Sequence, residues 1–234
     1  MSAQLHVSPD RAALVADAAD RLVRAIGDAI TARGRAVVAV TGGTVGIELL
    51  AALVDRPVDW SHVHVTWSDE RFVEAGSGDR NAVQAREALL DRIPIPATHV
   101  HELPAAGSGT LDQAALQATA LLEHLGGIDV TLLGVGPDAH IASLFPGLPG
   151  VAEAGARIIA VRDSPKPPPE RLSFTLDAIA ASERTWLVVA GADKAEAVRL
   201  ALSDAAPSEA PVAHARGRVE TLLLADADAA SLVA

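Results

Sequence analysis

The 234-residue chain contains no cysteine and no tyrosine. The absence of cysteine excludes disulfides, a thiolate nucleophile and cysteine-based zinc sites. Aromatic residues make up only 3% of the chain, which argues against a platform of ring faces that stacks on bases or sugars. The formal net charge of -11 argues against a nucleic-acid partner, because such partners are bound by a basic surface.

Long apolar runs are also missing from the sequence. No segment approaches the ~20 apolar residues that span a bilayer, and the first residues lack the basic and apolar regions of a signal peptide. We therefore expect a cytoplasmic protein without a membrane partner. Hydrophobic residues make up 50% of the chain, which is enough to form the core of one domain over residues 1–234, with room for a small extra lobe.

Short β-branched segments alternate with segments of helical spacing. Apolar residues recur about every fourth position at Leu14, Ala18, Leu22, Ile26 and Ile30, which predicts a helix over residues 11–32. Further helices are expected at residues 45–54, 81–91, 111–125, 174–181 and 192–202. Strands are expected at residues 36–40, 63–67, 100–103, 130–133, 158–161, 186–190 and 219–224. This alternation predicts an α/β fold with a mostly parallel sheet that is covered on both faces.

The stretch from residue 129 to residue 147 is the most informative part of the chain. The strand expected at residues 130–133 ends in a Gly/Pro turn, which then presents Asp138 and His140. Ligands of α/β proteins bind at the carboxyl ends of the strands, so His140 is a catalytic candidate there. Asp129 and Asp138 are both candidates for orienting its imidazole. Because the chain has no cysteine and no GxSxG motif, water activated by His140 is a simpler hypothesis than covalent catalysis.

Two other strand ends carry polar residues. The turn at residues 41–44 joins an expected strand to an expected helix, where glycine backbone and free N–H groups suit an anion. It matches neither a Walker loop nor a dinucleotide fingerprint, so ATP and NAD are not indicated. The next strand ends in Asp69, Glu70 and Arg71. Either the carboxylates orient Arg71 for binding a phosphate, or the three residues form a surface salt bridge.

Several basic residues and histidines fall in loops or near element ends. Lys166 and Arg171 flank a triple proline, and Lys194 lies near the start of the helix expected at residues 192–202. Isolated cations are usually solvated, but these recur at loops of the expected active edge. Two pairs of histidines are spaced by two residues, His62 with His64 and His99 with His101. They lack carboxylate or cysteine partners at ligand spacing, so we expect half-buried surface residues and no metal.

Six blocks of the sequence resemble the 6-phosphogluconolactonase family, the lactone hydrolases of the pentose phosphate pathway. They are TGGT at 41–44, WSDERFV at 67–73, Asn81 with ARE at 85–87, DVTLLGVGPDAHIASLFPG at 129–147, SPKPPPERLSFTL at 164–176 and GADKAEAV at 191–198. The family usually has glycine and threonine where this chain has Ala139 and Ile141, SGGSTP where it has TGGTV, and tyrosine where it has Ala82. Ala139 tests whether the loop needs a positive φ, which alanine tolerates poorly.

The resemblance implies a Rossmann-like three-layer sandwich that hydrolyses 6-phospho-D-glucono-1,5-lactone to 6-phospho-D-gluconate. His140 would be the general base, and Asp129 or Asp138 would hold its ring. The implied substrate- and phosphate-binding residues are Thr41, Gly42, Gly43, Thr44, Asp69, Glu70, Arg71, Asn81, Lys166, Arg171 and Lys194. Among these, Arg71, Lys194 and Arg171 would bind the phosphate. No cofactor, metal or obligate protein partner is implied.

Two alternatives remain open at this point. A glucosamine-6-phosphate deaminase or isomerase shares the fold and a similar Asp-Gly-His-Ile-Ala loop, and Ile141-Ala142 favours it. The SPKPPPER block and the Ser143–Pro146 run favour the lactonase. A non-catalytic sugar-phosphate sensor is the other alternative. In such a sensor we expect one or more of the acid–base residues to be replaced, and here Asp129, Asp138 and His140 are all present.

Overall fold

The main sheet has six parallel strands in the order β1-β9-β8-β5-β2-β3. This computed structural model describes residues 3–107 and 109–233. The strands are β1 (Gln4–Ser8), β2 (Ala36–Val40), β3 (Val63–Trp67), β5 (Val130–Gly134), β8 (Arg184–Val189) and β9 (Glu220–Asp226). The strands predicted at residues 36–40 and 63–67 are confirmed with the same bounds. The edge strand β1 was not predicted, because its half-exposed residues form no apolar run.

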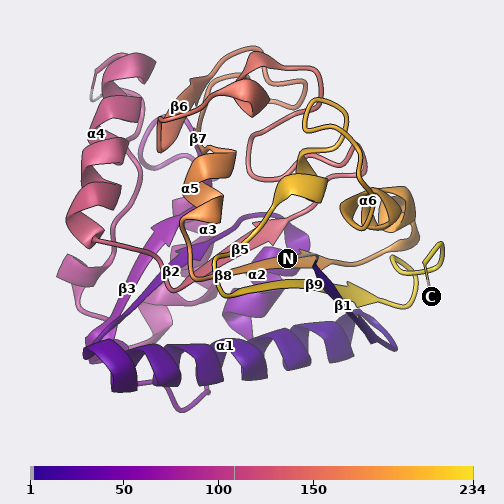
Figure 1. The fold of residues 1–234 in the computed structure, drawn as a ribbon. Coiled ribbons are helices and arrows are strands. Elements are labelled where there is room, and N and C mark those ends of the chain that lie inside the picture. Colours follow the sequence, from indigo (N-terminus) through magenta and orange to yellow (C-terminus); the bar gives the residue numbers. More distant parts are fainter. Residues whose placement is uncertain (1–2, 108, 234) are drawn as a thin grey trace.

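Helices cover both faces of this sheet (Figure 1). They are α1 (Arg11–Arg33), α2 (Thr44–Ala51), α3 (Asn81–Ala88), α4 (Leu111–Leu125), α5 (Leu176–Ala180) and α6 (Ala195–Ala201). Short 3-10 helices are η1 (Trp60–His62), η2 (Leu90–Arg92), η3 (Ala97–His99), η4 (Pro149–Ala152), η5 (Ala192–Lys194) and η6 (Pro211–His214). Figure 1 shows α1 below the sheet and α5 above it, so the predicted three-layer α/β architecture is confirmed. No helix within the described ranges is long and apolar enough to cross a membrane.

The chain order of the strands places a crevice between β2 and β5. From β2 the chain continues through α2 to β3 on one side, whereas from β5 it continues to β8 on the other side. Neighbouring strands whose connections leave in opposite directions form a topological switch point, where the loops at their carboxyl ends diverge. The loops that follow these two strands are residues 41–43 and 135–148, and the second contains Asp138 and His140. The fold therefore brings the two best sequence candidates to one crevice.

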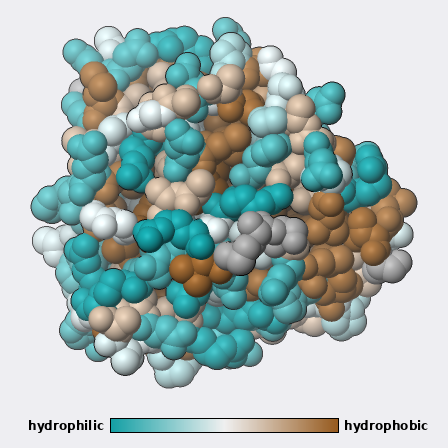
Figure 2. Space-filling model, viewed as in Figure 1, coloured by the Kyte–Doolittle hydropathy of each residue, from teal (hydrophilic) through white to brown (hydrophobic). Residues whose placement is uncertain are grey.

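The longest helix, α1, begins and ends where its sequence provides caps. The Asp10 side chain accepts a hydrogen bond of 2.8 Å from the Ala13 N–H, which satisfies one free donor of the first turn. The helix ends at Gly34, whose φ of 76° suits glycine. Leu14, Leu22 and five other apolar residues are buried against the sheet. The surface over α1 in Figure 2 is mainly hydrophilic, as an amphipathic helix requires.

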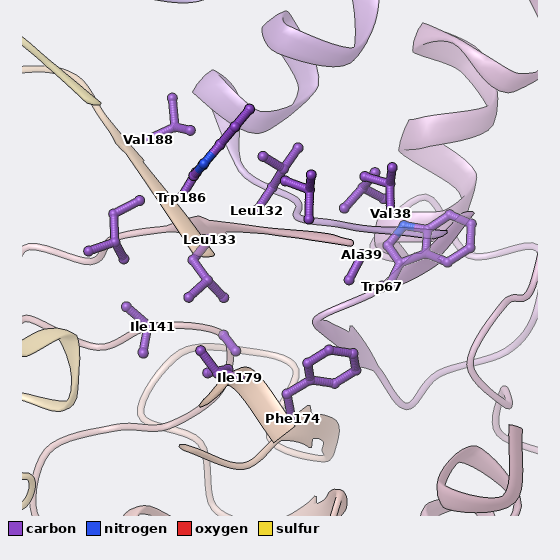
Figure 3. Packing of buried hydrophobic residues seen from close by; sticks show 14 of the residues in the cluster. Val38, Ala39, Trp67, Leu132, Leu133, Ile141, Phe174, Ile179, Trp186 and Val188 are labelled. Carbon is purple, nitrogen blue, oxygen red and sulfur yellow. The ribbon is translucent and has the colours of Figure 1, made fainter. Parts of the chain in front are cut away.

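The core fills both sides of the parallel sheet. Successive strand residues point to opposite faces, so Leu132 packs on one side and Leu133 on the other (Figure 3). Trp186 and Val188 share the side of Leu132, whereas Ile179 lies with Leu133. All of these side chains are at most 3% exposed. Burial on both faces explains why the central strands appear in the sequence as continuous apolar runs.

A second sheet of three antiparallel strands packs beside the main one. Its order is β4 (Asp69–Arg71), β7 (Arg171–Phe174) and β6 (Ile158–Val161). The helix predicted at residues 174–181 is wrong at its start, because β7 extends through Phe174 and α5 begins at Leu176. The strand predicted at residues 100–103 is also wrong, since only a single bridge joins Val100 to the main sheet. In both places pairing with neighbouring strands, which the local sequence does not show, decides the structure.

Candidate active site

A cavity of about 340 Å³ opens at the switch point between β2 and β5. Its walls come from the loops after these strands, from the second sheet, and from the start of η5–α6. The lining residues are Thr41, Gly42, Gly43, Asp69, Arg71, Asn81, Gly134, Val135, Gly136, His140, Ala142, Lys166, Pro167, Arg171 and Lys194. The volume lies in the range of pockets that hold small metabolites. Most of the predicted site residues are therefore brought together, although they are spread over more than 150 residues of chain.

His140 and Asp138 form a hydrogen-bonded pair at this cavity. His140 Nδ1 is 2.5 Å from Asp138 Oδ1. A carboxylate only accepts hydrogen bonds, so in the neutral imidazole the proton sits on Nδ1 and the lone pair on Nε2 is free. Asp138 therefore lies where it can orient His140. The two side chains lie over Gly136, where a Cβ atom would be 1.9 Å from His140 Nδ1.

The loop that carries the pair has a left-handed residue at Ala139. Its φ is 65°, and its side chain is completely buried. The Ala139 N–H donates to the Gly136 carbonyl at 3.0 Å, and the Gly136 N–H donates to the His140 carbonyl at 2.9 Å. These two bonds close the turn and fix the direction of the imidazole. The loop therefore does need a positive φ at the position where the related family usually has glycine, and alanine adopts it here at a steric cost.

The surroundings of His140 set its basicity. Its side chain is only 14% exposed and packs on the Phe145 ring, with 4.5 Å between the ring centroids. Burial lowers the pKa of His140 below its ordinary value, and Lys166 lowers it further, while Asp138 and Asp69 act in the opposite direction. Burial opposes the ionisation of Asp138, but the hydrogen bond from His140 prevails and holds the pKa of that carboxyl below its ordinary value. The pair is thus a neutral imidazole beside an ionised carboxylate at neutral pH.

Two cations and one turn offer sites for an anion. Arg71 donates from Nη1 to the Asp79 carbonyl at 2.6 Å, and within the described ranges no carboxylate lies within salt-bridge distance of it. Lys194 Nζ is 3.3 Å from the Asp193 carboxylate. Gly43 caps α2 with a φ of 78° and no side-chain hydrogen bond, so N–H groups of the first turn are available to a ligand. Thr41 Oγ1 accepts the Gly134 N–H at 3.3 Å and so links the two loops of the crevice.

Asp69 and Asn81 form a buried polar wall of the cavity. Asp69 accepts a hydrogen bond of 2.7 Å from the Ser143 hydroxyl, and the Asn81 amide donates to the Asp69 carbonyl at 2.9 Å. The Asn81 Oδ1 atom is buried and has no hydrogen-bond partner among the described residues. It lies under Gly42, where a Cβ atom would be 2.0 Å away, so only glycine lets the turn approach so closely. Ser143 was not predicted, because an isolated serine carries no sequence signal.

Arg171 holds a loop and is nearly saturated with protein acceptors. Its Nη2 donates to the Lys166 carbonyl at 2.8 Å and to the Pro167 carbonyl at 3.2 Å, and its Nε donates to the Pro168 carbonyl at 3.1 Å. Nη1 is 3.5 Å from the Ser143 hydroxyl. A guanidinium has five N–H donors, so little capacity is left for a phosphate. Arg171 lines the cavity but mainly fixes the proline-rich loop.

The structure corrects the role predicted for Asp129. This residue directly precedes β5, at the end of the sheet opposite His140. Its Oδ2 accepts the Val37 N–H at 2.7 Å, and its Oδ1 accepts a hydrogen bond from Arg33. β5 is five residues long, so it separates Asp129 from the cavity by roughly 16 Å. Asp129 therefore joins strands and does not orient the imidazole.

Glu70 and Thr44 also lie outside the cavity lining. Glu70 is fully buried and accepts the backbone N–H groups of Arg71, Asn81 and Ala82, at 2.7 to 2.9 Å. It caps the first turn of α3, and burial raises its pKa despite these bonds. Thr44 is an exposed first residue of α2. Both were predicted to bind substrate, and the cavity lining includes neither.

Three histidines stack at the edge of β3, away from the cavity. The His64 and His99 rings are 4.0 Å apart, and His64 Nδ1 is 2.9 Å from His101 Nε2. Burial, the two neighbouring rings and Arg35 lower the pKa of His64 to about 4. Their planes are nearly parallel, at 26° and 17°, so the nitrogens do not converge on one point. Over the residues that the structure describes, no group of three or more His, Asp or Glu side chains could hold a metal ion.

Both lysines of the chain line the cavity, whereas the other 17 basic residues are arginines. Their scarcity is a signal in the sequence that points to Lys166 and Lys194 together. Lys166 lies beside the catalytic candidates, with its Nζ 3.4 Å from His140 Nδ1. The structure thus places Lys166, one of the predicted substrate- or phosphate-binding residues, next to the acid–base pair.

Comparison with known proteins shows the family of this chain. A family model described as glucosamine-6-phosphate isomerases/6-phosphogluconolactonase matches residues 9–224. A 6-phosphogluconolactonase of Mycobacterium tuberculosis is 45% identical over 99% of this chain and 98% of its own, and one of Streptomyces coelicolor is 45% identical over 97% and 94%. The solved structure of 6-phosphogluconolactonase from Trypanosoma brucei has a TM-score of 0.88 at 26% identity, covering 100% of this chain and 99% of that one. The chain belongs to the glucosamine-6-phosphate isomerase/6-phosphogluconolactonase family.

Proposed function

We propose that this chain hydrolyses 6-phospho-D-glucono-1,5-lactone to 6-phospho-D-gluconate, with His140 as the base that activates water. The observation that carries the proposal is the hydrogen bond between His140 and Asp138 at the wall of a cavity lined by four cationic side chains. Its relatives are named for this lactonase reaction. A cytoplasmic location and the lack of a nucleic-acid or obligate protein partner stay predictions.

His140 and Asp138 perform the proton transfers. The free Nε2 of His140 takes a proton from water as the water oxygen attacks the lactone carbonyl carbon. The imidazolium that forms is stabilised by the Asp138 carboxylate, which keeps the ring in one orientation and one tautomer. When the tetrahedral intermediate collapses, the bond from the carbonyl carbon to the ring oxygen breaks. Nε2 returns its proton to that oxygen, so the base is regenerated and no cofactor is consumed.

Backbone N–H groups stabilise the charge on the carbonyl oxygen. The Gly42-Gly43 turn borders the cavity and supplies these N–H groups, because the N–H groups of Gly134, Gly136 and Ala139 already donate within the protein. Donors fixed before the reaction cost no reorganisation as the oxyanion forms. Asp69 and Asn81 face the same space and suit the hydroxyl groups of the sugar ring.

Arg71 and Lys194 anchor the 6-phosphate. Arg71 has no carboxylate partner within the described part of the chain, so its guanidinium keeps donors for phosphate oxygens. The amino end of α2 adds N–H groups and a positive dipole. An anchor at the far end of the substrate orients the lactone carbonyl toward His140, which converts binding into correct placement of the reacting atoms.

The test is the initial rate of lactone hydrolysis at low pH against an enzyme-free blank, because the lactone also opens spontaneously. His140→Ala is expected to lower kcat/KM by about 10²- to 10⁴-fold. His62→Ala is the matched control, since His62 also pairs with an aspartate, Asp59 at 3.0 Å, but on the surface. A wild-type rate equal to the blank would refute the lactonase proposal and, without ammonia release from glucosamine-6-phosphate, leave the sugar-phosphate sensor. Release of ammonia from glucosamine-6-phosphate would instead assign the deaminase reaction.

A further inference from the structure

Lys166 lies beside the acid–base pair. Its Nζ is 3.6 Å from Asp138 Oδ1 and 3.4 Å from His140 Nδ1. We propose that Lys166 is a positioning residue for His140: its ammonium offsets the Asp138 carboxylate, so the imidazole stays a free base while Asp138 still holds its Nδ1–H. The inference rests on the proposed function, in which His140 is the base.

The backbone of Lys166 is fixed by the segment around it. The Ser164 hydroxyl donates to the Lys166 carbonyl at 2.8 Å and lies 3.3 Å from the Lys166 N–H. Arg171 donates to the same carbonyl at 2.8 Å and to the carbonyls of the next two residues. The three prolines that follow Lys166 restrict φ further. These contacts fix the Lys166 backbone beside the cavity, and the side chain, 42% exposed, reaches the Asp138 carboxylate from there.

The charges around the pair show why a cation belongs there. His140 faces the carboxylates of Asp138 and Asp69, the ammonium of Lys166 and the uncharged ring of Phe145. Both carboxylates favour the protonated imidazole, which cannot act as a base. Lys166 is the cation that opposes them at His140. Asp138 in turn holds the ammonium against repulsion from Lys194 and Arg171.

Lysine suits this position better than arginine. The ammonium is a compact point charge, whereas a guanidinium is a planar fork that binds carboxylates through two parallel hydrogen bonds. A fork on Asp138 would compete with His140 Nδ1 for the same oxygen. The chain uses arginine at 17 of its 19 basic positions and lysine at only two, both in this cavity. The choice of lysine here therefore follows from the need for charge without a competing hydrogen-bond pair.

The direct experiment follows the titration of the His140 ring by NMR in the free protein, together with the pH profile of kcat/KM. Lys166→Met removes the charge and is expected to raise the pKa of His140 by about half to one pH unit, since the partly exposed pair is screened by solvent. The acidic limb of the rate profile moves up by the same amount. Lys166→Arg retains the charge and is not expected to raise the pKa of His140, because competition of the guanidinium for Asp138 acts in the opposite direction.

Lys194→Met is the matched control, because it removes the only other lysine of the cavity. It is expected to raise KM and weaken inhibition by inorganic phosphate without moving the acidic limb. If Lys166→Met shows this same pattern and leaves the His140 titration unchanged, Lys166 is a phosphate ligand and the inference is wrong. An equal shift in Lys166→Arg would also overturn it, because the charge would then not be the cause.

The titration keeps this inference separate from the proposed function. It is measured without turnover, so it gives a result even if the wild type fails to hydrolyse the lactone. In that case the lactonase proposal fails, and the effect of Lys166 on His140 is still decided by the shift. If Lys166→Met does not give the dispersed spectrum of a folded protein, Lys166→Gln supplies the uncharged variant with a polar side chain.

Discussion

Gly136 leaves no room for a methyl group beneath the Asp138–His140 pair. A Cβ atom at this position would lie 1.9 Å from His140 Nδ1 and 2.4 Å from Asp138 Oδ1. To reach an ordinary van der Waals separation, the imidazole must withdraw by about 1.5 Å. The φ of Gly136 is not positive, so alanine adds no backbone strain and acts on the pair alone.

A displacement of this size is large for catalysis. Misplacement of a catalytic group by about 1 Å costs roughly 100-fold in rate, so Gly136→Ala is expected to lower kcat/KM by about 100-fold or more. That loss corresponds to about 2.7 kcal/mol of transition-state stabilisation. The assay is the initial rate of lactone hydrolysis against the blank, with thermal unfolding measured on the same samples.

Two other glycines calibrate the result. Gly27 is an exposed residue of α1 with nothing within 4 Å of its Cβ position, so Gly27→Ala is expected to keep wild-type activity and to gain up to about 1 kcal/mol of stability. Gly134 borders the same cavity, and its Cβ atom would meet Thr41 Oγ1 at an ordinary 3.7 Å, so Gly134→Ala should lose less activity than Gly136→Ala. A Gly136→Ala variant within threefold of the wild-type kcat/KM would refute the role of this pair.

Three further predictions test the corrected and proposed roles. Asp129→Asn weakens the bond to Arg33 and is expected to cost about 1–3 kcal/mol in urea unfolding, with kcat/KM of the folded protein unchanged; a loss of kcat at unchanged stability would return Asp129 to the catalytic set. Arg71→Met is expected to raise KM about tenfold or more and to weaken inhibition by inorganic phosphate in parallel, and an unchanged KM would exclude it as the anchor. The pKa of His64 is about 4 in the folded protein and about 6.5 in the unfolded chain, so the unfolded chain takes up this proton at higher pH. Stability should therefore fall as the pH drops from about 6.5 to 4, by about 1 kcal/mol for this partly exposed ring, and His64→Asn should remove that fall in urea midpoints.

The main sheet was predictable because its strands are buried on both faces. β2 and β3 are short apolar runs between turns and helices, so their bounds could be taken from the sequence. The second sheet was not predictable in the same way. β4 consists of Asp69, Glu70 and Arg71, whose charges indicate a loop until the backbone of β7 and the start of α3 supply their partners. Strands made of buried charged residues depend on tertiary contacts that no local pattern shows.

The direction of β5, and not the residue type, decides which of Asp129 and Asp138 can reach the cavity. Both aspartates flank β5, but one lies before the strand and the other after the turn that follows it. Parallel strands of a sheet present all their carboxyl ends at one edge, so only residues after a strand can reach the crevice. Asp129 accepts a backbone N–H of β2 at the opposite edge for this reason. The sequence held this information, provided that the direction of each strand was applied to each candidate.

Arg171 and Lys166, at the two ends of the proline-rich segment, have different roles at the site. Arg171 donates hydrogen bonds from its planar guanidinium to three successive carbonyl oxygens. The compact ammonium of a lysine could not reach all three. Lys166 presents a single charge to a pair whose acceptor oxygen is already occupied by His140. Exchanging the two residue types would loosen the loop and crowd the pair at once. The order of lysine, prolines and arginine in this segment therefore specifies where the cation stands, and the cation sets the range of pH in which His140 can act as a base.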